Sequence, residues 1–267
     1  MVYLHSKILK ITQETRVQTR FLLKIDTAHF KPFSMNACPL RKGISMCDVT
    51  LISPSFFTHK SEVLAMIQES SADLLVLPTW SEATDTDQAV YEYPSVAEIQ
   101  AVLGKGQRAY CQQWRADKSP RNLILSHKNM VSLGREISAE EIAALPDDFL
   151  KRLRKRRSVE IKKHRIVFVF ADEVNALADM AELDLQADLL VYPMSIRPNP
   201  WTKLSRPLKI LSKTASTAMV AHNNGNSPKT LGKTTTSLKL INHGEENKLS
   251  IWHSDSKTFS LTIPLAD

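Results

Sequence analysis

One heptapeptide occurs twice in this chain, and its recurrence constrains the fold more than any other feature. ADLLVLP occupies residues 72–78 and ADLLVYP occupies residues 187–193, with six of the seven residues identical. Each copy follows a strand-like segment and then an amphipathic helical segment. Recurrence in the same local context favours two halves built from one β-α-β unit. The alternative is chance similarity between two buried strands, because short apolar runs of this composition are common.

The first half shows its unit clearly. Residues 47–57 have the composition of a buried strand, and residues 59–71 place Val63, Leu64 and Ile67 at helical spacing. The heptapeptide that follows is a short apolar run that ends at a proline, which is typical of a strand inside a sheet. The same order therefore predicts strand, helix and strand.

The second half repeats this order, with a strand predicted over residues 165–173 and a helix over residues 174–186. The other predicted elements are a helix at 94–106, a strand at 107–114, a hairpin at 122–136 turning at Lys128–Asn129, a helix followed by a strand at 207–224, and antiparallel strands over 234–265 with turns at His243–Asn247 and Ser254–Lys257. Alternating helices and strands joined by hairpins indicate an α/β protein with a layered sandwich architecture. Residues 1–46 are interpreted as an N-terminal extension and residues 47–267 as the domain.

The composition excludes several classes of protein. Of 267 residues, 43% are hydrophobic and 24% are charged, as in ordinary soluble proteins. The three cysteines (Cys38, Cys47 and Cys111) are too few and too scattered for a disulfide framework or a zinc cluster, which favours a reducing compartment. No apolar run approaches the roughly 20 residues of a membrane span. We therefore expect a cytoplasmic protein that binds no membrane, no metal and no cofactor.

Two motif types that would bind ligands are rejected. Gly232-Lys233-Thr234 resembles the end of a phosphate-binding loop, but Gly225 and Gly232 enclose six residues where that motif needs four. The β-prone residues that follow also differ from the helix that such a loop begins. The dispersed histidines are expected in solvent or turns rather than as metal ligands: His59, His127, His164, His222, His243 and His253.

The net charge of +7 is concentrated in parts of the chain. Residues 149–165 contain nine basic residues and one acidic residue, and we interpret them as a basic insertion. Such a density suits phosphate contacts in a nucleic acid or an acidic partner. The alternative is a solvated basic helix face that the preceding acidic residues partly neutralise. The candidate binding residues are Lys151, Arg152, Arg154, Lys155, Arg156, Arg157, Lys162, Lys163 and Arg165.

Asp172 and Glu173 end a predicted buried strand, where α/β proteins often carry catalytic groups. Adjacent residues of a strand point to opposite faces, so these two carboxylates do not form an acid/base pair. One of them could act as a lone base. The alternative is a polar strand end that caps the next helix, whose N-terminus attracts acidic side chains.

The order of these elements over residues 47–267 resembles the carbon–nitrogen hydrolase (nitrilase) superfamily. ADLLVLPTW resembles its first signature, an apolar strand ending in Pro-Glu, and RIVFVFADE resembles its nucleophile strand, apolar-Cys-x-Asp/Glu. MVAHNNG resembles its later Asn-x-x-Gly strand end, and GKTTTSLKLI its Gly-x-Ser segment. The resemblance implies an α-β-β-α sandwich with two pseudo-symmetric halves.

The chemistry of that superfamily uses a Cys nucleophile, a Glu general base and a Lys that stabilises the oxyanion. Aligning the motifs places Ala171 at the Cys position, Thr79 at the Glu position and Arg135 at the Lys position. The nearest alternative glutamate to Thr79 is Glu82. The resemblance therefore implies a pseudoenzyme. The alternative is an active hydrolase or amidase with non-standard residues, including a relocated cysteine.

Members of the superfamily associate into dimers or larger assemblies, so the resemblance implies a homo- or hetero-oligomer. Nitrilase-like domains are also known fused to, or encoded beside, reverse transcriptases in bacterial antiphage defence. Together with the basic segment, this suggests the hypothesis of a scaffold subunit that binds a protein partner and RNA or DNA.

Overall fold

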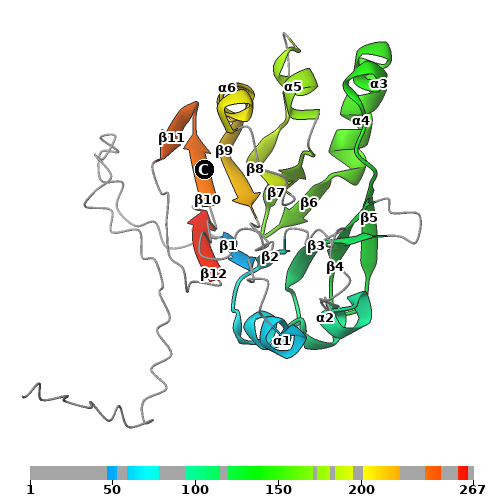
Figure 1. Ribbon diagram of the computed structural model, residues 1–267, viewed down its shortest axis with the longest axis vertical. Coiled ribbons are helices and arrows are strands. Elements are labelled where there is room, and N and C mark those ends of the chain that lie inside the picture. The colour runs from blue at the N-terminus through cyan, green and yellow to red at the C-terminus, as the bar shows by residue number, and fades with distance from the viewer. Residues whose placement is uncertain are drawn as a thin grey trace, which may run out of the picture.

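The computed structural model describes residues 47–52, 59–77, 94–114, 120–170, 173–180, 184–194, 201–222, 238–247 and 258–263. They form two six-stranded sheets with helices (Figure 1). The first sheet has the order β12 (Thr258–Ile263), β1 (Cys47–Ile52), β2 (Leu74–Leu77), β3 (Arg108–Trp114), β4 (Pro120–Leu125) and β5 (Met130–Gly134). The second has the order β11 (Glu245–Asn247), β10 (Leu238–Asn242), β9 (Ala215–His222), β8 (Ala187–Met194), β7 (His164–Phe168) and β6 (Ser158–Ile161).

The described helices form the outer layers. Two of them, α1 (Lys60–Glu69) and α2 (Val96–Val102), cover the first sheet. The second sheet is covered by α3 (Ala139–Ala144), α4 (Pro146–Arg156), α5 (Glu173–Ala178) and α6 (Trp201–Leu211). A third hydrophobic cluster lies between the sheets, with Val49 and Leu74 from one sheet and Ile166 and Leu189 from the other. The layers therefore follow the order α-β-β-α, as the sequence predicted.

The two sheets repeat one topology. β1, β2 and β3 are parallel neighbours, and so are β7, β8 and β9. In each sheet, two antiparallel strands flank the trio on one side, β4 and β5 in the first sheet and β10 and β11 in the second. One antiparallel strand flanks it on the other side, β12 in the first sheet and β6 in the second. The heptapeptide repeat lies on the equivalent strands β2 and β8. The two pseudo-symmetric halves are therefore confirmed.

The aspartate of the heptapeptide makes an equivalent hydrogen bond in both halves. Asp73 Oδ2 accepts a hydrogen bond from Asp48 N at 2.9 Å, and Asp188 Oδ2 accepts one from Arg165 N at 2.7 Å. Asp48 and Arg165 are each the second residue of the preceding parallel strand. A side-chain acceptor at this position satisfies a backbone donor where the ladder begins, so the repeat preserves a structural contact as well as an apolar pattern.

Several predictions need correction. Residues 149–165, interpreted as a basic insertion, comprise most of α4, all of β6 and the first two residues of β7, so they contribute a helix and part of a hairpin to the second half. His164, expected in solvent or a turn, is 1% exposed. It lies on the same face of β7 as Ile166 and Phe168, which pack between the sheets. The predicted turn at Ser254–Lys257 lies outside the described residues.

Two lysines form the tight turn of the β6–β7 hairpin. Lys162 and Lys163 both have positive φ angles, of 49° and 70°, where glycine and asparagine are usual. Lys162 Nζ lies 2.8 Å from Asp73 Oδ1, so an ion pair joins this hairpin of the second sheet to the start of β2 in the first. The turn is therefore held by a contact between the sheets as well as by its own ladder.

We expect Asp188→Ala to lower the free energy of unfolding by about 1 kcal/mol, because Arg165 N loses its acceptor. Asp188→Asn keeps an acceptor oxygen and should cost less than half as much. Urea unfolding of both variants measures the difference. Equal losses for the two variants would mean that the carboxylate charge, and not the backbone contact, is what matters.

Candidate functional site

The polar residues of interest gather where β5 and β7 end, which we call the carboxyl edge. Arg135 directly follows β5, and Glu173 is the first residue of α5 after β7. The other positions that the sequence singled out lie outside the described residues: Thr79, Glu82, Ala171 and Asp172. The structure therefore describes the β5 and α5 side of this edge.

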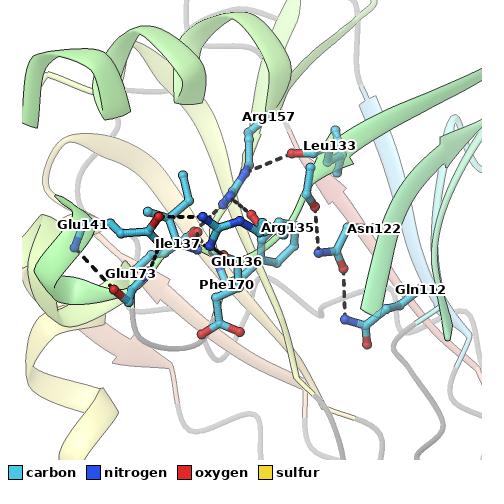
Figure 2. A network of polar contacts seen from close by, with 12 residues as sticks. Gln112, Asn122, Leu133, Arg135, Glu136, Ile137, Glu141, Arg157, Phe170 and Glu173 are labelled. Atoms are coloured by element: carbon cyan, nitrogen blue, oxygen red, sulfur yellow. Dashed lines mark hydrogen bonds and ion pairs between the residues drawn. The ribbon is translucent and has the colours of Figure 1, made fainter. Parts of the chain in front are cut away.

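A buried ion pair forms the centre of this edge. Arg157 Nη1 donates to Glu173 Oε2, and the two side chains are only 3% and 0% exposed. Arg157 directly follows α4 and Glu173 begins α5, so the pair joins two consecutive helices that β6 and β7 separate in the chain. Figure 2 shows the two side chains pointing toward one another. A charge at such depth requires a partner of opposite sign.

Two backbone N–H groups complete the contacts of Glu173. Ile137 N donates to Oε1 at 2.8 Å, and Phe170 N donates to Oε2 at 3.0 Å. Burial raises the pKa of the Glu173 carboxyl, while Arg157 and these two donors oppose that rise. Both oxygens are thus committed to structural contacts. Glu173 is therefore a buried anchor of the first turn of α5, which is close to the capping interpretation.

Arg157 also covers the end of β5. Its Nε donates to the carbonyl oxygen of Leu133 at 3.0 Å, and its Nη2 donates to that of Arg135. The register of β4 and β5 shifts here, because Asn122 pairs with Gly134 and Leu123 pairs with Ser132, leaving Leu133 as a bulged residue. The guanidinium carbon also lies 4.5 Å from the centre of the Phe170 ring. One side chain therefore ties the edge of the first sheet to the second half.

An aromatic and amide network continues this arrangement into the first sheet. The Tyr110 ring stacks on Phe168 at 5.0 Å between centroids, and its hydroxyl donates to Asn122 Oδ1 at 2.9 Å. Gln112 Nε2 donates to the same oxygen at 3.0 Å, and Asn122 Nδ2 donates to the carbonyl of Gly134 at 3.3 Å (Figure 2). These contacts fix the neighbouring strands β3, β4 and β5 relative to β7.

Arg135, at the position where the resemblance implies a lysine, is mostly exposed and bound to Glu141. Its guanidinium makes a two-pronged contact with the Glu141 carboxylate, and the Arg135 side chain is 68% exposed. This contact, with the backbone N–H of Ser138, lowers the pKa of Glu141 to about 2. The cation of Arg135 is therefore engaged with a surface carboxylate of α3.

The described cysteines are buried in the packed layers. Cys47 and Cys111 are both 0% exposed, Cys47 between the sheets and Cys111 under α1 and α2. Burial raises the pKa of each thiol to about 12, with Asp73 adding to the rise at Cys47. A thiol attacks only as its thiolate, so neither group is a nucleophile at neutral pH. Cys38 lies outside the described residues.

The nine basic residues proposed for partner binding do not form one surface. Arg157 belongs to the buried ion pair, and Lys162 is paired with Asp73, as described above. Arg154 is half-buried, and its Nη2 donates to the carbonyl of Asp184 at 3.0 Å. Arg165 is half-buried beside it. The exposed members are Lys151, Arg152, Lys155, Arg156, Lys162 and Lys163.

Helical phase is the sequence signal that separates Arg157 from its neighbours. Phe149, Leu153 and Arg157 are spaced four residues apart, so they share one face of the helix and its continuation. Phe149 and Leu153 are buried, at 3% and 1% exposure. Sequence reasoning treated all the arginines of this run alike and so missed the buried pair. Applying the helical period to the run would have indicated that Arg157 points inward.

The described residues include neither a candidate metal cluster nor a candidate membrane-spanning helix. In the part of the chain that the structure describes, no three or more histidine, cysteine or acidic side chains are placed to hold a metal ion. Over the same residues, no helix is both long and apolar enough to cross a membrane.

Solved structures with the same fold are found at low sequence identity. The CN-hydrolase superfamily protein XC1258 from Xanthomonas campestris, whose structure has an arsenic adduct in the active site, is 15% identical; the match has a TM-score of 0.55 and covers 82% of this chain and 91% of that one. The glutamine-dependent NAD+ synthetase from Acinetobacter baumannii, solved with ADP, is 12% identical with a TM-score of 0.52. That match covers 82% of this chain and 46% of that one, so this chain spans less than half of the synthetase.

No protein-family model and no curated protein sequence matches the chain. The structural likeness nevertheless shows that it has the fold of the carbon–nitrogen hydrolase superfamily. This confirms the fold and the resemblance that the sequence motifs implied.

Removing either partner of the buried pair should be severe. We expect Glu173→Gln and Arg157→Met each to lower the free energy of unfolding by about 3–5 kcal/mol, because each leaves an uncompensated buried charge. Arg135→Met, which breaks only the exposed pair with Glu141, serves as the matched control and should change urea unfolding little. Losses no larger than that of the control would contradict a buried pair.

The Arg157→Met variant should also acquire a pH dependence. Without Arg157, burial raises the pKa of Glu173 further, so the carboxyl takes up a proton on folding. Such a group stabilises the fold at low pH and loses this contribution as pH rises through the folded-state pKa. The deficit relative to the unmodified protein should therefore be smaller at pH 5 than at pH 8. A deficit independent of pH would contradict this assignment.

Proposed function

We propose that this chain is a non-catalytic scaffold with a nitrilase-like fold, serving as a subunit of a larger assembly. The observation that carries the proposal is that the polar side chains at the carboxyl edge are occupied by contacts within the protein. Both oxygens of Glu173 are occupied, and the cation at the position of the superfamily lysine is engaged with Glu141. A catalytic centre needs groups that are free to contact a substrate.

The residues at the aligned positions support the same proposal. Ala171 has no nucleophilic atom, and Thr79 has no carboxylate. Arg135 keeps a positive charge, but its planar guanidinium is not interchangeable with the compact ammonium by which a lysine would stabilise the oxyanion. A reaction that uses a thiol, a carboxylate and an ammonium group would therefore need other residues of the chain to supply all three groups.

An active hydrolase with non-standard residues is the competing function. It would draw on Glu82, Asp172 and Cys38, which lie outside the described residues. The buried thiols of Cys47 and Cys111 offer it no nucleophile, and the occupied carboxylate of Glu173 offers it no base. These three observations favour the scaffold.

As an assembly subunit, the chain would form a homo- or hetero-oligomer with a protein partner and RNA or DNA. A reverse-transcriptase-associated assembly in bacterial antiphage defence is one setting that the resemblance suggests. Native mass spectrometry of material purified from its own host tests this role. We expect species well above the 30.1 kDa of one chain; only free monomer would contradict it.

The reactivity of the thiols tests whether a relocated cysteine acts as a nucleophile. In a Cys38→Ser variant at pH 7.5, Cys47 and Cys111 should react with a disulfide reagent more than about a thousandfold slower than a free thiol, because burial keeps both protonated. Adding urea to unfold the chain should expose both at once. Rapid labelling of one thiol in the folded variant would reveal an activated cysteine.

Hydrolysis assays address the competing function directly. We expect no release of ammonia from a panel of aliphatic amides and nitriles above the buffer rate. Turnover that is lost in Glu82→Ala or in Cys38→Ser would overturn the proposal, because contaminating activity would not respond to these substitutions.

A further inference from the structure

We propose that the outward face of α4 binds the sugar-phosphate backbone of a nucleic acid. This inference rests on the proposed scaffold function and names the partner of one of its surfaces. The face, which we call the α4 basic face, comprises Lys151, Arg152, Lys155 and Arg156, all of which are exposed. These four are the exposed candidate cations of α4, whereas the exposed Lys162 and Lys163 lie in the β6–β7 turn.

The helical period produces this face. Phe149 and Leu153 are buried against the second sheet, which leaves the four cations in two pairs on the remaining surface of the helix. Residues four positions apart lie about 6 Å apart along a helix axis, at 1.5 Å per residue. The pairs Lys151–Lys155 and Arg152–Arg156 therefore form two adjacent rows of cations rather than a random scatter.

Charge is segregated along the helix. The acidic residues Asp147 and Asp148 lie in its first turn, whereas its last turn has only basic side chains. Lys151 Nζ lies 3.9 Å from Asp148 Oδ1, so this acidic end partly offsets one cation of the face. The positive potential should be strongest at Lys155 and Arg156, near the end of α4.

Folding brings a further cation to this end of the helix. Arg165 of β7 donates from Nη2 to the carbonyl oxygen of Arg154 at 3.2 Å, although the two residues are 11 positions apart in sequence. Its guanidinium thereby lies beside the last turn of α4. Arg165 therefore adds a half-buried cation beside the end of α4.

The absence of exposed apolar groups favours a nucleic acid over a protein at this face. Protein interfaces generally have an apolar or aromatic centre, whereas phosphate contacts need only cations. Among the described residues, the large hydrophobic side chains that are exposed are Met130, Val131, Leu145 and Ile210. None of these lies within α4; Leu145, the nearest in sequence, precedes its acidic first turn.

The test measures binding of the full chain to a fluorescein-labelled DNA duplex of about 20 base pairs and to an RNA strand of about 20 nucleotides by anisotropy at several salt concentrations. Four phosphate contacts predict a slope of log K against log salt of about −3.6 for the duplex, which is a loss of about 150-fold between 50 and 200 mM salt. Replacing all four cations by alanine should remove most of the binding at 50 mM salt. Because all four side chains are exposed, the fourfold variant should fold normally. Circular dichroism checks that it does.

A matched control removes four exposed cations elsewhere, with Lys105, Lys128, Lys203 and Arg206 replaced by alanine. It should bind nearly as the unmodified protein does, and Lys151→Arg with Lys155→Arg should also retain binding. Failure to bind either probe at 50 mM salt, an equal loss in the control, or equally strong binding of polyglutamate would overturn the inference. The hydrolysis and thiol experiments are unaffected by that outcome, so they test the scaffold function separately.

Discussion

The buried ion pair between Arg157 and Glu173 is the contact on which the arrangement of the carboxyl edge depends. It joins the end of α4 and the bulged end of β5 to the first turn of α5. Without it, the last carbonyls of β5 would lose their donors, and two charges would face a low-dielectric interior. The same contacts occupy both carboxylate oxygens of Glu173.

The two halves share a topology but have diverged where they would do chemistry. Asp73 and Asp188 still make equivalent backbone contacts at the start of the parallel strands. At the opposite edge, the exposed Arg135 is paired with Glu141.

Apolar periodicity and the heptapeptide repeat predicted the two halves, because both are local signals, and the resemblance to the superfamily implied the α-β-β-α sandwich. The sequence did not predict α3, α4 or β6. It also identified Arg135 as the cation after β5, but it assigned Glu173 to the end of a strand, whereas the structure places this residue at the start of α5. It did not reveal the pairing of Glu173 with Arg157, since that contact joins residues 16 apart across two elements and depends on helical phase within a run of similar side chains. His164 was misplaced for a related reason, because the β7 pleat turns it inward between the sheets.

The central claim is that Arg157 and Glu173 act as one structural unit. A double-mutant cycle with Arg157→Met, Glu173→Leu and the combined variant tests it most directly, by urea unfolding at pH 7. The account predicts that the combined variant is more stable than the sum of the single losses allows, by about 2 kcal/mol or more, because neither charge is then left unpaired. Additive losses would contradict the account.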